Sequence, residues 1–246
     1  ARGVEGVRDL LRDLVPQADA ARRIAEILRA WDGSTASDEI GVSVYHVFRE
    51  RLGERLLRER LGENRRLLEL REEAQPLPGV LLARFLDRVQ PGRASALIED
   101  ALAETWTWLG IQVSANPKRW AWGEVHGVRM VHALERLGSN GLRWAGRSLG
   151  RGPFPSPGDP DSPWTMYHSR LPTRSVSLGP AARYAVDLGD LDHAQFGLAG
   201  GQSGHPGSHH YDDGLAEWLQ GRARPLWMHR IDVAYHEAGR WELEPR

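Results

Sequence analysis

The chain has 246 residues, a formal net charge of −1 at pH 7 and 41% hydrophobic residues, including ten tryptophans. This length suffices for one large core or two modest ones, and the small net charge gives no electrostatic reason to expect nucleic acid or an acidic membrane as a partner. The absence of cysteine excludes disulfides and thiolate metal sites. No apolar run approaches the ~20 residues of a membrane helix, and the first residues do not resemble a secretory leader.

Apolar residues at helical spacing predict helices through most of the first ~110 residues. Pro16, Asp32-Gly33-Ser34 and Gln90-Pro91-Gly92 are the expected stops between them. The charged run from Glu50 to Arg60 is interpreted as a solvated helix face. The expected helices are 4–15, 17–31, one that starts after Ser37 and runs on to about residue 60, and then 64–73, 80–89 and 93–109.

The character of the sequence changes at Asn116-Pro117, where tryptophan, glycine and histidine become frequent. Residues 149–164 are rich in proline and glycine and are expected to form a loop. Strands are expected at 165–169, 174–178, 182–188 and 194–198, with weaker candidates at 225–229 and 240–243 and a short helix at 229–238. We therefore expect an α+β fold, with a mainly helical segment at 1–115 and a Trp/Gly-rich and β-strand segment at 116–246.

The stretch 198–213 is unusually dense in glycine, small hydroxyl residues and histidine. It follows an expected strand and leads into an expected helix at 214–220. We predict a tight turn in which the glycines adopt positive φ and Gln202 and Ser203 bond to the local backbone. Asp212 or Asp213 is expected to cap the helix that follows.

Two catalytic interpretations of this turn compete with a structural one. The run Gly201 to His205 compares poorly with a G-x-S-x-G nucleophile elbow, because His205 stands where glycine is required. A metal-dependent hydrolase would use the cluster His205, His209, His210, Asp212 and Asp213, but adjacent histidines usually point apart in an extended chain. Turn packing and helix capping are the favoured roles.

Two further groups in the middle of the chain invite a chemical interpretation. His126 and His132 follow the Trp120 and Trp122 pair and suggest an acid–base pair, although a polar group inside an aromatic core is favoured for His126. The loop with Asp159 and Asp161 lacks the ligand spacing of an EF-hand and is interpreted as rigid.

Several motifs together resemble the penicillin acylase family of N-terminal-nucleophile amidohydrolases. The run Gly200 to Asp213, followed by Trp218, Gly221 and Pro225, is similar to the family's C-terminal signature. Other landmarks occur in the same order, and the similarity extends from Val4 to the end. These landmarks are Trp31-Asp32-Gly33, Trp120 to His126, Gly152 to Pro155, Gly158-Asp159 and Trp241 to Pro245.

The resemblance implies removal of an acyl group from an amide, such as a β-lactam side chain or an N-acyl homoserine lactone. The family nucleophile is a Ser, Thr or Cys whose own α-amine acts as the base, whereas residue 1 here is Ala. The chain is therefore expected to be the C-terminal part of a β subunit, silent alone. Its strands would complete an αββα sandwich with the α subunit and the N-terminal part of the β subunit from the same precursor.

The resemblance also implies a periplasmic or secreted location and no cofactor, although some members hold a structural calcium whose ligands are not assigned in this chain. It places a structural turn near the active site, and it makes Asp187 a candidate to support a histidine near the nucleophile. The residues alone favour a strand-end salt bridge from Asp187 to Arg183 or Arg174. A non-catalytic binding or scaffold domain is the rival function. The structural turn that the resemblance places near the active site consists of Gly201, Gln202, Ser203, Gly204, His210, Tyr211 and Asp212.

Overall fold

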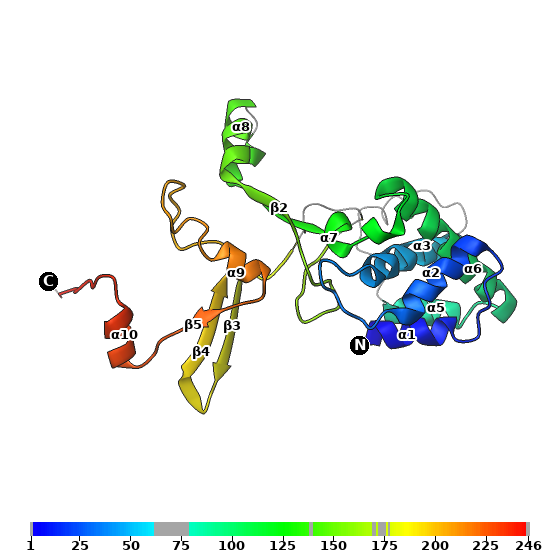
Figure 1. Ribbon diagram of the computed structural model, residues 1–246, viewed down its shortest axis with the longest axis horizontal. Helices are drawn as coiled ribbons and strands as arrows, with labels where there is room; N and C mark the ends of the chain where they lie inside the picture. Colours follow the sequence, from blue (N-terminus) through cyan, green and yellow to red (C-terminus); the bar gives the residue numbers. More distant parts are fainter. Residues whose placement is uncertain are drawn as a thin grey trace. The chain divides into compact units, whose positions relative to one another are not determined.

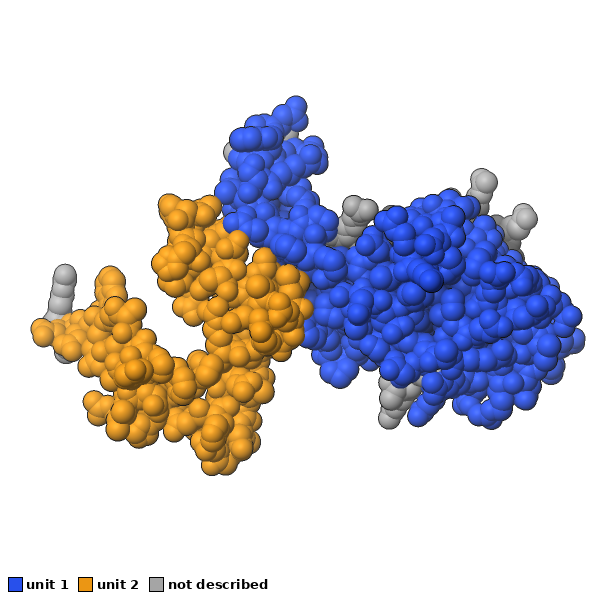
Figure 2. All heavy atoms as spheres, viewed as in Figure 1, with its two compact units in different colours: residues 1–179 blue, residues 180–246 orange. Residues whose placement is uncertain are grey.

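The computed structural model describes residues 2–61, 79–137, 140–168, 171, 176 and 178–244. Contacts within the chain divide it into two compact units, residues 1–179 and 180–246, coloured blue and orange in Figure 2. The predicted change of character at residues 115 and 116 falls inside the first unit.

A group of helices opens the first unit, with α6 packed against both α2 and α3 (Figure 1). Their apolar faces form the main core, in which Ile24, Leu28, Phe48, Leu52 and Leu102 are almost completely buried. Burial of such faces supplies most of a helix's stability in water. The helices are α1 (Arg2–Leu11), α2 (Asp19–Ala30), α3 (Gly41–Leu61), α5 (Gly79–Leu86) and α6 (Pro91–Gln112).

The expected helices in this region match those observed to within a few residues, except that 64–73 lies outside the described residues. Pro91 separates two helices as expected and is also the first residue of α6. Proline suits that position because the first helical N–H groups have no partner within the helix.

Shorter elements complete the first unit. Strands β1 and β2 pair antiparallel, with Val128 opposite Phe154. The prediction of a loop over 149–164 is wrong for the part that forms β2. The predicted strand 165–169 is also wrong over its described part, since Thr165 and Tyr167 form only isolated bridges. The elements are η1 (Pro117–Arg119), α7 (Trp122–Val125), β1 (Gly127–Met130), η2 (Ala133–Arg136), α8 (Asn140–Leu149) and β2 (Arg151–Pro155).

The second unit is built on a three-stranded antiparallel sheet in the order β3-β4-β5. The strands expected at 182–188 and 194–198 and the helices expected at 214–220 and 229–238 are confirmed, whereas 240–243 is not a strand. Most of the strand predicted at 174–178 lies outside the described residues. The elements are β3 (Ala182–Asp187), β4 (Asp190–Leu198), α9 (Leu215–Leu219), β5 (Arg224–Pro225) and α10 (Arg230–His236). Within the described ranges, no helix has the length and apolar character needed to cross a membrane.

Candidate functional site

The first unit encloses a cluster of histidine and tryptophan rings. Trp122 in α7 lies between two histidines: its ring stacks on His46 of α3 at 4.9 Å and on His126 at 4.3 Å between centroids. His168 presents its edge to both histidines, at 5.0 and 5.3 Å. All four side chains are completely buried, so this cluster is part of the core and has no access to solvent.

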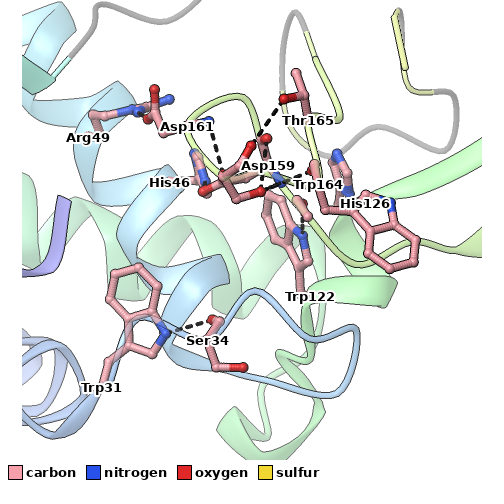
Figure 3. Close-up of polar contacts among 12 residues, drawn as sticks. Trp31, Ser34, His46, Arg49, Trp122, His126, Asp159, Asp161, Trp164 and Thr165 are labelled. Carbon is pink, nitrogen blue, oxygen red and sulfur yellow. Dashed lines mark hydrogen bonds and ion pairs between the residues drawn. The ribbon is translucent and has the colours of Figure 1, made fainter. Parts of the chain in front are cut away.

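The loop that follows β2 is attached to this cluster through its two aspartates (Figure 3). The carboxylate of Asp159 lies 3.0 Å from His46 Nε2 and also accepts the backbone N–H of Asp161 at 2.9 Å. Asp161 forms an ion pair with Arg49, one turn along α3 from His46. These contacts connect a loop more than 100 residues distant in sequence to one face of α3.

Gly158 allows the same loop to approach α7. Trp122 Nε1 donates to the Gly158 carbonyl at 2.8 Å. Gly158 has φ of +83°, and a Cβ there would lie 2.1 Å from the Trp164 carbonyl oxygen. Only glycine meets both conditions, because an L side chain is strained at this φ and would clash with the backbone.

Burial lowers the pKa of all three histidines, because the charged imidazolium loses its hydration. The pKa of His126 falls to about 4 and that of His168 to about 2. The pKa of His46 is lowered by burial and by Arg49, against the opposing effect of Asp159. Burial raises the pKa of Asp159, but the hydrogen bond to His46 and further contacts outweigh it and bring the value to about 2.

At neutral pH the three histidines are therefore neutral and Asp159 is ionised, with the ring N–H of His46 directed at the carboxylate. Completely buried rings are out of reach of an external substrate. The contacts of His46 with Trp122 and Asp159 instead connect α3, α7 and the loop. The expectation that His126 is a polar core group agrees with its Nδ1, which lies 3.2 Å from the Ser156 carbonyl oxygen. His132 instead accepts the Leu134 N–H at the start of η2.

Sequence reasoning missed His46, Arg49 and His168 and treated the aspartate loop only as rigid. A detectable signal was the pair of polar residues His46 and Arg49 within the most buried stretch of the α3 sequence. A polar group inside a core requires a partner. The partner was not identifiable from spacing, because it lies 113 residues away.

The glycine–histidine turn, residues 198–213, lies in the second unit. Its two arms are joined by backbone hydrogen bonds from Gly201 to Tyr211 and from Ser203 to His210, both 3.0 Å long. Ser203 Oγ accepts the His205 N–H at 3.1 Å, as a local turn contact. The turn borders a cavity of about 270 Å³ whose lining includes Phe196, Leu198, Gln202, His210 and Arg224.

The glycines of this turn act differently from the prediction. Positive φ occurs at Gly33, Gly152, Gly158 and Gly221, and at no described glycine of the turn. Gly201 is required for close approach instead: a Cβ there would lie 1.8 Å from the His210 carbonyl oxygen.

The helix cap predicted from Asp212 or Asp213 is also wrong, because Gly214 is the N-cap of α9 and no side chain bonds there. The Asp213 carboxylate lies 3.1 Å from His210 Nδ1 and 3.4 Å from Arg224 Nη1. His209 and His210 do not point apart, since their ring centroids are 3.7 Å from each other. Within the described ranges, no group of three or more His, Asp and Glu side chains is arranged to hold a metal ion.

Asp187 lies at the exposed end of β3, where its carboxylate accepts the Gly189 N–H at 2.8 Å. This contact closes the turn to β4. Arg183, the described arginine considered as its partner, directs its guanidinium at the Trp218 carbonyl at 2.8 Å, and Arg174 lies outside the described residues. The suggested role of Asp187 beside a nucleophilic site stays a prediction, as does the role of the turn near the active site.

Comparison with known proteins identifies the family. Residues 4–234 match the penicillin amidase family, and the chain belongs to it. The acyl-homoserine lactone acylase QuiP of Pseudomonas aeruginosa is 25% identical, over 91% of this chain. The protein of the same name from Pseudomonas putida is 27% identical over 89% of this chain, and the penicillin acylase 2 proenzyme of Pseudomonas sp. (strain SE83) is 27% identical over 92%.

The match covers only part of each relative. The chain spans 29%, 28% and 29% of the length of these three proteins, in the same order. The family resemblance inferred from the motifs is thereby confirmed, and most of each relative has no counterpart in the 246 residues.

Proposed function

We propose that the chain is the C-terminal part of an amidohydrolase of the penicillin acylase type, which removes the acyl group from an amide. The observation that carries the proposal is a family match over residues 4–234 combined with coverage of less than a third of relatives named as acylases. N-acyl homoserine lactones and β-lactam side chains are the candidate substrates, because the relatives are named for these compounds.

We further propose that the chain alone is silent and that catalysis requires the remaining polypeptide of the same precursor. The environment of the polar side chains supports this. Ser203, the serine considered as a nucleophile, uses its Oγ within the turn. His46, His126 and His168 are completely buried, so none of them is within reach of a proton on an external substrate.

The rival hypothesis of a self-standing binding or scaffold domain predicts a surface without large exposed apolar side chains. The second unit departs from this expectation. The exposed fraction is 89% for Leu188, 83% for Tyr235 and 93% for Trp241. Several large apolar side chains left exposed in one unit fit a surface that another polypeptide covers.

The proposal is tested by measuring release of free amine from an N-acyl homoserine lactone and from a penicillin. Two samples are compared at equal molar concentration: the 246-residue chain and the complete product of the parent gene, purified without denaturation. We expect acyl release by the complete product and none above the uncatalysed rate by the chain.

Release by the isolated chain would contradict its proposed silence. Failure of the complete product on both substrates, and on a series of acyl-chain lengths, would contradict the amidohydrolase proposal. The intact masses of the complete product provide a control, since a processed acylase yields a chain that begins with Ser, Thr or Cys.

A further inference from the structure

The segment around α8 in the first unit carries a local excess of positive charge. Between Glu124 and Asp159 the sequence holds five arginines and a single acidic residue, Glu135. The net charge of −1 for the whole chain conceals this excess. The expectation that an acidic membrane is not a partner rests on that net charge and does not describe this segment. The five residues are Arg129, Arg136, Arg143, Arg147 and Arg151.

The acidic side chain of this segment is used within it. The carboxylate of Glu135 accepts two hydrogen bonds from Arg129, 2.8 and 2.7 Å long, and the side chain is only 12% exposed. Arg147 lies 3.5 Å from the same carboxylate, and its own side chain is 67% exposed. Because one carboxylate cannot neutralise two guanidinium groups, a positive charge remains at the exposed surface of α8.

One face of α8 packs against η2 and the other faces outward (Figure 1). Gly146 lies on the packed face, since a Cβ there would be 2.2 Å from the backbone nitrogen of Glu135. Trp144 is displaced by about 160° around the helix from Gly146 and is 73% exposed. Arg143 and Arg147 are also exposed and lie on one side of Trp144, within about 100° of it. None of the described residues of α8 belongs to the main apolar core.

An exposed indole beside guanidinium groups on a helix suits the boundary between water and an anionic bilayer. Tryptophan is enriched at that boundary because its ring is apolar and its N–H is polar. Arginine can bury its apolar stem while its charge stays among the headgroups. A nucleic acid or an acidic peptide would meet the same charges, but a convex helix face with one indole offers neither a series of stacking rings nor a groove.

We propose that the outward face of α8, formed by Arg143, Trp144 and Arg147, binds the surface of a membrane rich in anionic phospholipid. Two arginines and one indole give a weak and reversible attachment, in which the helix lies on the bilayer without crossing it. The proposal goes beyond the proposed function, because it concerns where the protein is held and not which bond it cleaves.

The test is cosedimentation of the complete gene product with vesicles, either of phosphatidylcholine alone or of phosphatidylcholine mixed with phosphatidylglycerol. At low salt we expect at least about tenfold stronger binding to the mixed vesicles, and high ionic strength should remove the difference by screening the charges. Equal binding to both kinds of vesicle would overturn the proposal. Displacement by inorganic phosphate at the concentration of the headgroups would also overturn it, because a simple anion site would then explain the binding.

Variants of the complete product assign the binding to α8. Arg143→Gln combined with Arg147→Gln should weaken binding to the mixed vesicles at least about tenfold, and Trp144→Ser at least about threefold. The matched control is Arg12→Gln combined with Arg22→Gln, which removes the same charge from side chains that are 70% and 53% exposed elsewhere in the first unit. An equal loss in the control would overturn the proposal, since net charge alone would then account for the binding.

The 246-residue chain distinguishes the remaining occupant of the α8 face. If the rest of the precursor covers this face, the chain alone binds the mixed vesicles and the complete product does not, and that result would overturn the proposal. Acyl release is measured on the same preparations and should be unchanged in the α8 variants. Vesicle binding and acyl release can therefore fail separately.

Discussion

At the scale of single residues, the closest backbone approach in the glycine–histidine turn is at Gly201. The space for a side chain there is occupied by the His210 carbonyl group. A few residues further on, Gly204 has no atom within 4 Å of the position of a Cβ. A side chain would therefore clash with the backbone at Gly201 but not at Gly204. Alanine substitutions at these two positions of one turn form a test and its control.

Gly201→Ala is expected to lower the free energy of unfolding of the second unit by about 2 kcal/mol, because the added methyl group forces the two arms of the turn apart. Gly204→Ala should change it by no more than about 0.5 kcal/mol. Urea denaturation of the 246-residue variants measures both values. Equal unfolding free energies for the two variants would show that the close approach at Gly201 has no energetic weight.

At the scale of elements, the aspartate loop and α3 are joined by groups that are costly to bury separately. Asp159 is ionised and nearly inaccessible, so removal of His46 leaves a buried charge with one partner fewer. The same contact fixes the position of the loop relative to Trp122. A polar contact inside the core thereby determines how a long loop packs on a helix.

A double-mutant cycle with His46→Phe and Asp159→Ala is expected to give a coupling free energy of about 1–3 kcal/mol at pH 7. Phenylalanine keeps an aromatic ring beside Trp122 and removes the hydrogen bond. The pair Arg93 and Glu59, which joins α6 to α3 at the surface, serves as the comparison and should couple far more weakly because water screens it. Additive effects of the two core substitutions would contradict the proposed connection.

At the scale of the whole molecule, the buried histidines are confined to the first unit. The second unit carries exposed histidines, such as His193, whose side chain is 78% accessible. Acid should therefore destabilise the first unit. The direction in which the stability of the first unit changes with pH follows from the lowered pKa values of its histidines. An unfolded histidine, with a pKa of about 6.5, binds a proton that the folded, buried ring does not accept, so stability falls as pH falls.

We expect the unfolding free energy of the first unit to decrease from about pH 6.5 downward, by up to about 1.4 kcal/mol per pH unit for each buried histidine. The His126 contribution ends near pH 4 and that of His168 near pH 2, and Asp159 adds to the loss below about pH 3.8. Hydrogen exchange at pH 7 and pH 5 measures the two units separately.

The decisive variant is His168→Phe, because neither ring nitrogen of His168 has a hydrogen-bond partner among the described residues. In this variant the unfolding free energy of the first unit should depend less steeply on pH, by about 1.4 kcal/mol per pH unit. The unfolding free energy at pH 7 should change little. An unaltered slope in His168→Phe would show that this ring is protonated in the folded state.

Much of this protein is determined by local sequence. The apolar spacing of α2 and α6 places their core residues without reference to the rest of the chain, and Pro91 marks where α6 begins. The acylase motifs are likewise carried by residue types in a fixed order, so the family was identifiable from the sequence.

Only the tertiary structure decided the placement of polar groups whose partners are distant in sequence. His46 meets Asp159 across 113 positions, and β2 emerges from a proline-rich run because β1 is available to pair with it. The spacing at Gly201 likewise depends on a carbonyl group nine residues away. The spacing of apolar residues indicates which face of its own helix or strand a residue occupies. Hydrogen bonds and close approaches depend instead on which segments the fold brings together.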